Sequence, residues 1–141
     1  MNRHMSIEER MKCKNKAERQ FENEFNYQQR DKGGICIKYG LNNIELPDES
    51  YQNLKHIPSF IRNTPDFLCV KSNKFYMVEV KGCGKNLWLK TPDFDNYKIW
   101  SNTFPLYFYI LQNSTERYAY KSVSKMEELI DKNLWAPNKI Q

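Results

Sequence analysis

Three charged residues near the middle of the chain could carry out phosphate chemistry. Asp66 directly precedes the apolar run 67–70, and Glu79 and Lys81 lie inside a second apolar run, 75–81. Successive side chains of a strand point to opposite faces, so Glu79 and Lys81 share one face. Both residue types are poor strand formers, and burying them among apolar neighbours costs free energy unless each has a partner.

The segment between the two apolar runs brings the acids together. Residues 71–74 are polar and suit a hairpin turn, which would return Glu79 to lie close to Asp66. Carboxylate oxygens are the ligands that magnesium prefers, and a lysine supplies positive charge beside a scissile phosphate and its attacking water. The sequence therefore predicts a site for a hard divalent cation next to a phosphate. The alternative is a solvated salt bridge between Glu79 and Lys81 that performs no chemistry.

The tetrapeptide Thr-Pro-Asp-Phe occurs twice, at 64–67 and at 91–94. In the second copy threonine can cap a helix, proline can occupy its first position, and the acid falls in its first turn. We therefore assign Asp93 a structural role in starting a helix. The chemistry is assigned to Asp66, in the first copy.

Elements on either side must position these residues. Ala17, Phe21 and Phe25 recur every four residues, which predicts one face of a helix ending near Gly33-Gly34. Polarity and turn residues predict a loop or small insertion at 40–58 with a helical turn at 51–55. The other expected elements are strands at 35–39, 66–70, 75–81, 106–111 and 117–121, a helix at 93–101, and a closing helix at 126–130 capped by Ser124.

This order of elements predicts an α/β fold with a mixed central sheet flanked by helices. At 141 residues the chain fits one domain, which we place at 17–141 with its insertion at 40–58. Residues 1–16 are polar and charged, so we expect a flexible or helical N-terminal extension.

The residues Pro65-Asp66 followed by Glu79-Val80-Lys81 resemble the motif of the PD-(D/E)XK nuclease superfamily, which includes restriction endonucleases, Holliday junction resolvases and small phage nucleases. A loop containing Gly82 follows the lysine, and the order of elements from 17 to 111 is similar to the restriction endonuclease-like αβββαβ core. The resemblance implies that Asp66, Glu79 and the Val80 carbonyl hold Mg²⁺, for which Mn²⁺ can substitute. It also implies that Lys81 orients or deprotonates the attacking water.

Members of this superfamily often carry a further acid on the first helix. The resemblance favours Glu22 as a catalytic residue, with Glu18 one turn earlier as the substitute, and either could instead be a solvated helix glutamate. Tyr97 could reach the site from the following helix or could belong to the core.

Composition is consistent with an anionic partner. Lys and Arg number 22 against 17 Asp and Glu, for a net charge of +5. We expect Lys85, Lys90 and Lys98 to contact the DNA backbone, although each could be an ordinary solvated lysine. Four cysteines without a Cys-x-x-Cys pair and only two histidines disfavour a zinc site. No leader or apolar span is evident, so we expect a soluble cytoplasmic protein with no membrane partner.

The sequence thus predicts a metal-dependent endonuclease that hydrolyses DNA phosphodiester bonds, with branched or junction DNA as a possible preferred substrate and a homodimer as a plausible assembly. Two other classes stay open. One is a catalytically inactive nucleic-acid-binding module on the same fold, and the other is a phage or host interaction protein whose basic face meets an acidic partner.

Overall fold

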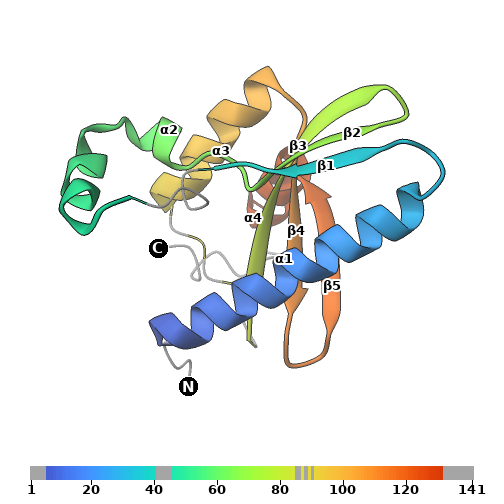
Figure 1. The fold of residues 1–141 in the computed structure, drawn as a ribbon, viewed down its shortest axis with the longest axis horizontal. Helices are drawn as coiled ribbons and strands as arrows, with labels where there is room; N and C mark the ends of the chain where they lie inside the picture. The colour runs from blue at the N-terminus through green and yellow to red at the C-terminus, as the bar shows by residue number, and fades with distance from the viewer. Residues whose placement is uncertain (1–5, 41–45, 85–86, 88, 90, 132–141) are drawn as a thin grey trace.

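A mixed sheet forms the centre of the protein and lies between helices on both faces (Figure 1). The computed structural model describes residues 6–40, 46–84, 87, 89 and 91–131, and within them five strands form one sheet in the order β1-β2-β3-β4-β5. The strands are β1 (Ile35–Lys38), β2 (Phe67–Lys71), β3 (Lys74–Cys83), β4 (Leu106–Gln112) and β5 (Arg117–Ser122), and the α-helices are α1 (Ile7–Gln29), α2 (Ser59–Arg62), α3 (Thr91–Thr103) and α4 (Val123–Asp131).

The pairing of the strands follows from how they are connected. Short turns join the antiparallel pairs β2–β3 and β4–β5. The antiparallel pair β1–β2 is connected by the long segment 39–66, and β3 and β4 pair in parallel and are connected through α3. The predicted α/β fold, with its αβββαβ order and mixed sheet, is confirmed. None of the helices in the described ranges is long and apolar enough to cross a membrane.

Helix α1 covers one face of the sheet. The predicted stripe of Ala17, Phe21 and Phe25 is buried there against β2, β3 and β4, and Cys13 extends it by one turn. The helix begins at Ile7, after Ser6, whose Oγ accepts a hydrogen bond from the Glu9 backbone N–H over 3.1 Å. Residues 7–16 are therefore helical, one of the two expected states of this extension. The helix ends at Gln29, earlier than predicted.

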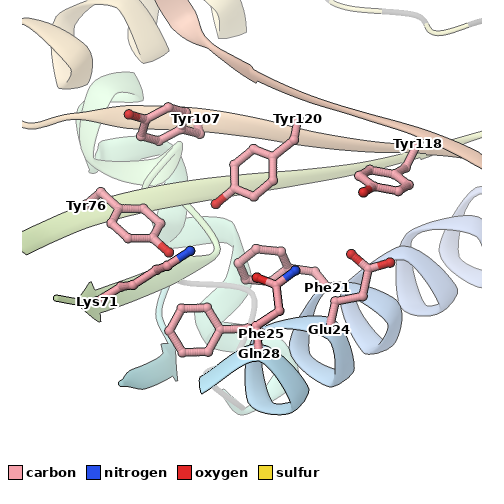
Figure 2. Close-up of a pocket in the computed structure, with 9 residues that line it drawn as sticks. All are labelled: Phe21, Glu24, Phe25, Gln28, Lys71, Tyr76, Tyr107, Tyr118 and Tyr120. Carbon is pink, nitrogen blue, oxygen red and sulfur yellow. The ribbon is translucent and has the colours of Figure 1, made fainter. Parts of the chain in front are cut away.

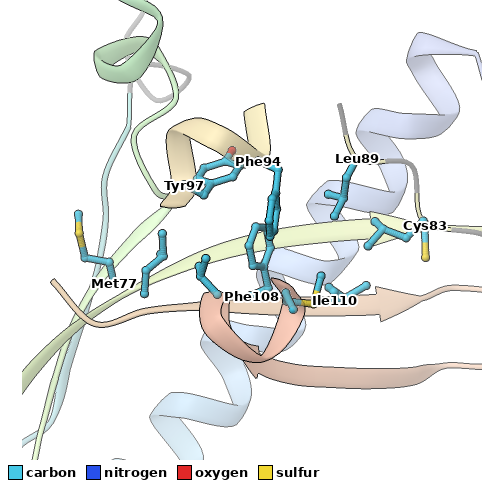
Figure 3. Close-up of a cluster of buried hydrophobic side chains, with 11 residues drawn as sticks. Met77, Cys83, Leu89, Phe94, Tyr97, Phe108 and Ile110 are labelled. Carbon is cyan, nitrogen blue, oxygen red and sulfur yellow. The ribbon is translucent and has the colours of Figure 1, made fainter. Parts of the chain in front are cut away.

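Helices α3 and α4 cover the opposite face. Figure 3 shows Phe94 and Tyr97 of α3 directed at Phe108 of β4, with Met77 of β3 in the same cluster. The Tyr97 and Phe108 rings meet edge to face with centroids 5.3 Å apart. The alternation of β3 is as predicted, because Met77 faces this cluster while Val78 and Val80 face α1.

Helix α1 and strand β3 make a close backbone contact at Gly82. A Cβ atom at this position would overlap the backbone carbonyl of Cys13, so only glycine permits the contact. The expectation of a loop at Gly82 was wrong, because this residue lies inside β3. The close contact brings the first half of α1 over the central strand.

Several element boundaries also differ from expectation. β2 begins at Phe67 rather than at Asp66, and α3 begins at Thr91, so that Asp93 lies in its first turn as predicted. The insertion contains a 3₁₀ helix, η2 (Asp48–His56), and the unpredicted helix α2 follows directly after it. Ser124 does not cap α4: the helix starts at Val123, and the Ser122 Oγ accepts from the Lys125 N–H over 3.1 Å.

Candidate active site

The candidate site forms where β3 extends beyond β2. Phe67, the first residue of β2, pairs with Val78, so in the described structure β3 continues to Cys83 without a β2 partner. The Val80 N–H faces this opening and donates to Asp66 Oδ2 over 2.8 Å. A side-chain carboxylate thus replaces the next residue of a partner strand, because a buried backbone N–H requires an acceptor.

Glu79 lies beside this opening and is 3% exposed. Its Oε2 accepts a hydrogen bond from the Tyr97 hydroxyl over 2.8 Å and lies 3.2 Å from Lys81 Nζ. Its Oε1 is buried and has no hydrogen-bond partner within the described part of the chain. A buried carboxylate oxygen in this state retains the capacity to bind a cation or a donor.

Lys14, which was not among the predicted site residues, lies at the centre of the site. Its Nζ lies 2.9 Å from Asp66 Oδ2, 2.9 Å from the Val80 carbonyl oxygen and 3.8 Å from Glu79 Oε2. The ammonium group therefore contacts all three groups that the motif assigns to a metal ion. Gly82 makes this possible, since it lets α1 approach β3 one residue away from Lys14.

Burial and charge perturb the acids in opposite directions. Burial raises the pKa of Asp66 to about 8, the charge of Glu79 adds to this rise, and Lys14 opposes it. Burial alone would also raise the pKa of Glu79, but Lys14 and Lys81 hold it below its usual value. Two carboxylates with differently perturbed pKa values in one site are typical of functional sites.

These residues line a cavity of about 210 Å³, together with Arg62, Asn63, Thr64 and Tyr97. The buried Thr64 Oγ1 has no hydrogen-bond partner among the residues placed by the structure. The described ranges contain no group of three or more His, Cys, Asp or Glu side chains suited to a metal. The donor set, two carboxylates and a main-chain carbonyl, still fits Mg²⁺, which commonly keeps several waters and uses only one or two carboxylates.

The other predicted site residues are not brought to this cavity. Glu22 Oε1 lies 3.7 Å from Lys38 Nζ of β1, whereas Glu18 Oε1 lies 3.8 Å from Lys14 Nζ. Of the two helix acids, it is thus Glu18 that the structure connects to the site. Lys98 forms ion pairs with acids of α3 and α4, Asp95 over 3.5 Å and Glu127 over 3.1 Å. The predicted DNA contacts Lys85 and Lys90 lie outside the described residues.

Sequence reasoning left Tyr97 open between the site and the core, and the structure places it in both: it packs in the core cluster and donates to Glu79. Lys14 was missed, although a weaker signal pointed to its position. The four-residue repeat of Ala17 and Phe21 continues back to Cys13, so the apolar face of the helix reaches the residue directly before Lys14. That repeat places Lys14 on a packed part of the helix, although it does not indicate a partner.

A larger cavity of about 460 Å³ lies between α1 and strands β2 to β5. Figure 2 shows Tyr76, Tyr107, Tyr118 and Tyr120 facing it from the strands, opposite Glu24 and the aromatic side chains of α1. Its lining contains a single acid and a single lysine, Lys71, and none of the residues predicted for catalysis. The chemistry therefore belongs to the smaller cavity.

Comparisons with known proteins found no protein-family model and no curated protein that matches the chain. One similar solved structure is Hjc, a Holliday junction resolvase from the archaeal hyperthermophile Archaeoglobus fulgidus. The TM-score is 0.45 at 14% sequence identity, over 74% of this chain and 75% of that chain. The function proposed below accordingly rests on the geometry of the site.

Proposed function

We propose that the protein is a divalent-metal-dependent nuclease that hydrolyses phosphodiester bonds of DNA. The observation that carries the proposal is the convergence of Asp66, Glu79 and Lys81 on one cavity at the start of β2. The Val80 carbonyl lies next to them, because Lys14 contacts it and Asp66 together. Each of these groups has a defined use in phosphate chemistry, and the two acids are held there against the free-energy cost of burial.

In this proposal Asp66, Glu79 and the Val80 carbonyl hold Mg²⁺ or Mn²⁺. The bound ion would supply Lewis acidity and a lowered pKa for its water. Lys81, whose side chain is 24% exposed, presents its ammonium at the cavity next to Glu79. It would orient the attacking water and compensate the charge that builds up on the phosphate as the bond to the leaving oxygen breaks.

The proposed substrate is DNA because the chain carries a net charge of +5 and the cavity wall includes Arg62. Lys98 contributes less than the sequence suggested, since Glu127 and Asp95 compensate its charge. Cleavage of both strands of a branched substrate would require two active sites, so a homodimer forms part of the proposal. Light scattering of the protein with and without a four-way junction tests that part.

The test is cleavage of end-labelled single-stranded, duplex, flap and four-way-junction DNA in Mg²⁺, Mn²⁺ or EDTA. We expect metal-dependent cleavage that Glu79→Gln and Lys81→Met each reduce by about 10²-fold or more. Lys125→Met serves as the control, because Lys125 is an α4 lysine paired with Glu128 over 3.6 Å. If no DNA is cleaved in any metal, or if the two site variants cut as fast as wild type, the proposal is wrong.

One observation favours a second candidate, a non-catalytic nucleic-acid-binding module. Lys14 already pairs with both carboxylates, so the fold does not depend on a metal to hold them together. For that candidate, DNA binding persists unchanged in Glu79→Gln while neither metal binding nor cleavage is detected.

A further inference from the structure

Lys14 occupies the position at which the two acids and the Val80 carbonyl would bind a cation. We propose that Lys14 is a displaceable internal counter-ion: its ammonium fills the cation position in the metal-free protein and must leave before a divalent ion binds. This inference rests on the proposed metal dependence. It adds Lys14 as a residue that determines the concentration of divalent metal needed to fill the site.

The contacts of Lys14 are those of a ligated cation. Its Nζ lies 2.9 Å from both Asp66 Oδ2 and the Val80 carbonyl oxygen, and it is 3.8 Å from Glu79 Oε2. All three of these atoms belong to groups that the metal would also require. Two cations so close together repel strongly in a partly buried site, so the ammonium and the divalent ion exclude each other.

The metal-free fold needs a cation at this point. Asp66 is 5% exposed and Glu79 is 3% exposed, and two carboxylates this deeply buried are costly without a compensating charge. Of the two acids, Lys81 pairs with Glu79, through Oε2, whereas Lys14 bridges both acids. Lys14 therefore stabilises the arrangement of ligands before any metal is present.

A second partner for Lys14 lies one helical turn away. Glu18 Oε1 is 3.8 Å from Lys14 Nζ, and the Glu18 side chain is only 12% exposed. The Lys14 side chain is 29% exposed and has a flexible four-carbon stem, so a change of rotamer can move its ammonium toward Glu18 without moving the helix. After this movement Lys14 remains paired on the rim of the site, and both acids are free for the metal.

Removing the Lys14 charge should therefore tighten metal binding. The first measurement is calorimetric titration of Mn²⁺ into the wild type, Lys14→Met and Lys12→Met. We expect Lys14→Met to bind Mn²⁺ about tenfold or more tightly, because a like charge within a few ångströms no longer opposes it. Lys12→Met is the matched control, since its side chain lies on the same helix, is 78% exposed and pairs with Glu8. It should bind Mn²⁺ as the wild type does.

Thermal unfolding provides a second readout on the same proteins. Without metal, Lys14→Met should melt below the wild type, because its acids lose their counter-ion. Saturating Mn²⁺ should raise the Tm of Lys14→Met by more than it raises that of the wild type. An equal rise in both proteins would contradict the proposal.

The wild type alone gives an independent test that does not depend on a variant's folding. Brief acetylation followed by peptide mapping reports how accessible each lysine amine is. Mn²⁺ should increase labelling of Lys14 severalfold and leave Lys12 unchanged, because displacement exposes the Lys14 amine.

The outcomes separate this inference from the proposed function. If neither the wild type nor Lys14→Met binds Mn²⁺, both the metal-dependent function and the displacement are wrong. If both bind Mn²⁺ with equal affinity, or if Mn²⁺ binds without changing Lys14 labelling, the metal site stands and the displacement is wrong. Weaker binding by Lys14→Met would likewise overturn the displacement.

Discussion

The Tyr97 hydroxyl donates a hydrogen bond to Glu79 Oε2 over 2.8 Å, which connects helix α3 to strand β3 at the candidate site. Burial, and then the charge of Glu79, raise the pKa of Tyr97 well above its usual value, so this hydroxyl remains a donor at neutral pH. The bond fixes one oxygen of Glu79 and leaves Oε1 as the atom that can bind a cation.

We expect Tyr97→Phe to lower the free energy of unfolding by about 1–3 kcal/mol, since a buried carboxylate loses a donor. Mn²⁺ affinity should fall by about tenfold, because the ligand is no longer held in orientation. Denaturant unfolding and calorimetric titration measure the two effects. Tyr118→Phe, which alters a tyrosine that is 54% exposed on β5, should change neither quantity. Unchanged Mn²⁺ affinity in Tyr97→Phe would show that the bond does not position Glu79 for metal binding.

Gly82→Ala should separate α1 from β3. The added Cβ would overlap the Cys13 backbone carbonyl, which cannot move independently of the helix. We expect a loss of about 1–3 kcal/mol in the free energy of unfolding. Because Lys14 follows Cys13 directly, acetylation of its amine in the metal-free protein should also increase.

Gly33→Ala provides the control for this variant. Gly33 has φ +76°, and no atom lies within 4 Å of an added Cβ. Alanine there should cost about 1 kcal/mol through backbone strain alone. Labelling of Lys14 should stay at the wild-type level. The same increase in Lys14 labelling for both glycine variants would indicate general loosening rather than a local contact.

Asp66→Asn should separate stability from metal binding. The amide oxygen can still accept from the Val80 N–H and from Lys14, while the buried carboxyl group whose pKa burial raises to about 8 is replaced by a neutral group next to Glu79. We expect a Tm at neutral pH equal to or above that of the metal-free wild type, and Mn²⁺ binding too weak to detect. A large drop in Tm would mean that the Asp66 charge itself stabilises the fold.

Trp100 should stabilise segment 48–63, part of which borders the cavity. Its Nε1 donates to the Phe60 carbonyl over 3.0 Å, and the two rings stack with centroids 4.6 Å apart. We expect Trp100→Leu to speed hydrogen exchange across 48–63 while β3 and β4 keep their protection. Ile99→Ala, at a neighbouring position that is 47% exposed, should leave exchange in 48–63 unchanged. Uniform acceleration through the sheet would instead show that Trp100 supports the whole fold.

Local patterns were enough to predict the sheet and the hairpin. The alternation around Glu79 and the four-residue repeat from Ala17 depend only on which face of an element is buried, and both were confirmed. Of the two Thr-Pro-Asp-Phe segments, the second starts a helix as predicted, with Asp93 in the first turn of α3. Asp66 of the first lines the smaller cavity, and its chemical role stays a prediction. A helix start and a hairpin are encoded within about ten residues, which is why they could be predicted.

The part of the site that comes from α1 could not be predicted in this way. Glu18 and Glu22 lie one turn apart on the same side of the helix, and only the point where α1 crosses β3 determines which of them is near the acids. That crossing depends on a contact between Cys13 and Gly82, far apart in the chain. Lys14 was overlooked for the same reason, since its partner Asp66 is 52 residues away.

Strand β3 continues past the first residue of β2, and this has a consequence for solubility. An uncovered backbone edge on a central strand is a template onto which a strand of another molecule can add, and such edges promote aggregation. Asp66 and Lys14 occupy the N–H and the carbonyl of Val80, which are the groups an incoming strand would use. The residues proposed to prepare the site for a metal thus also protect the protein from edge-to-edge association.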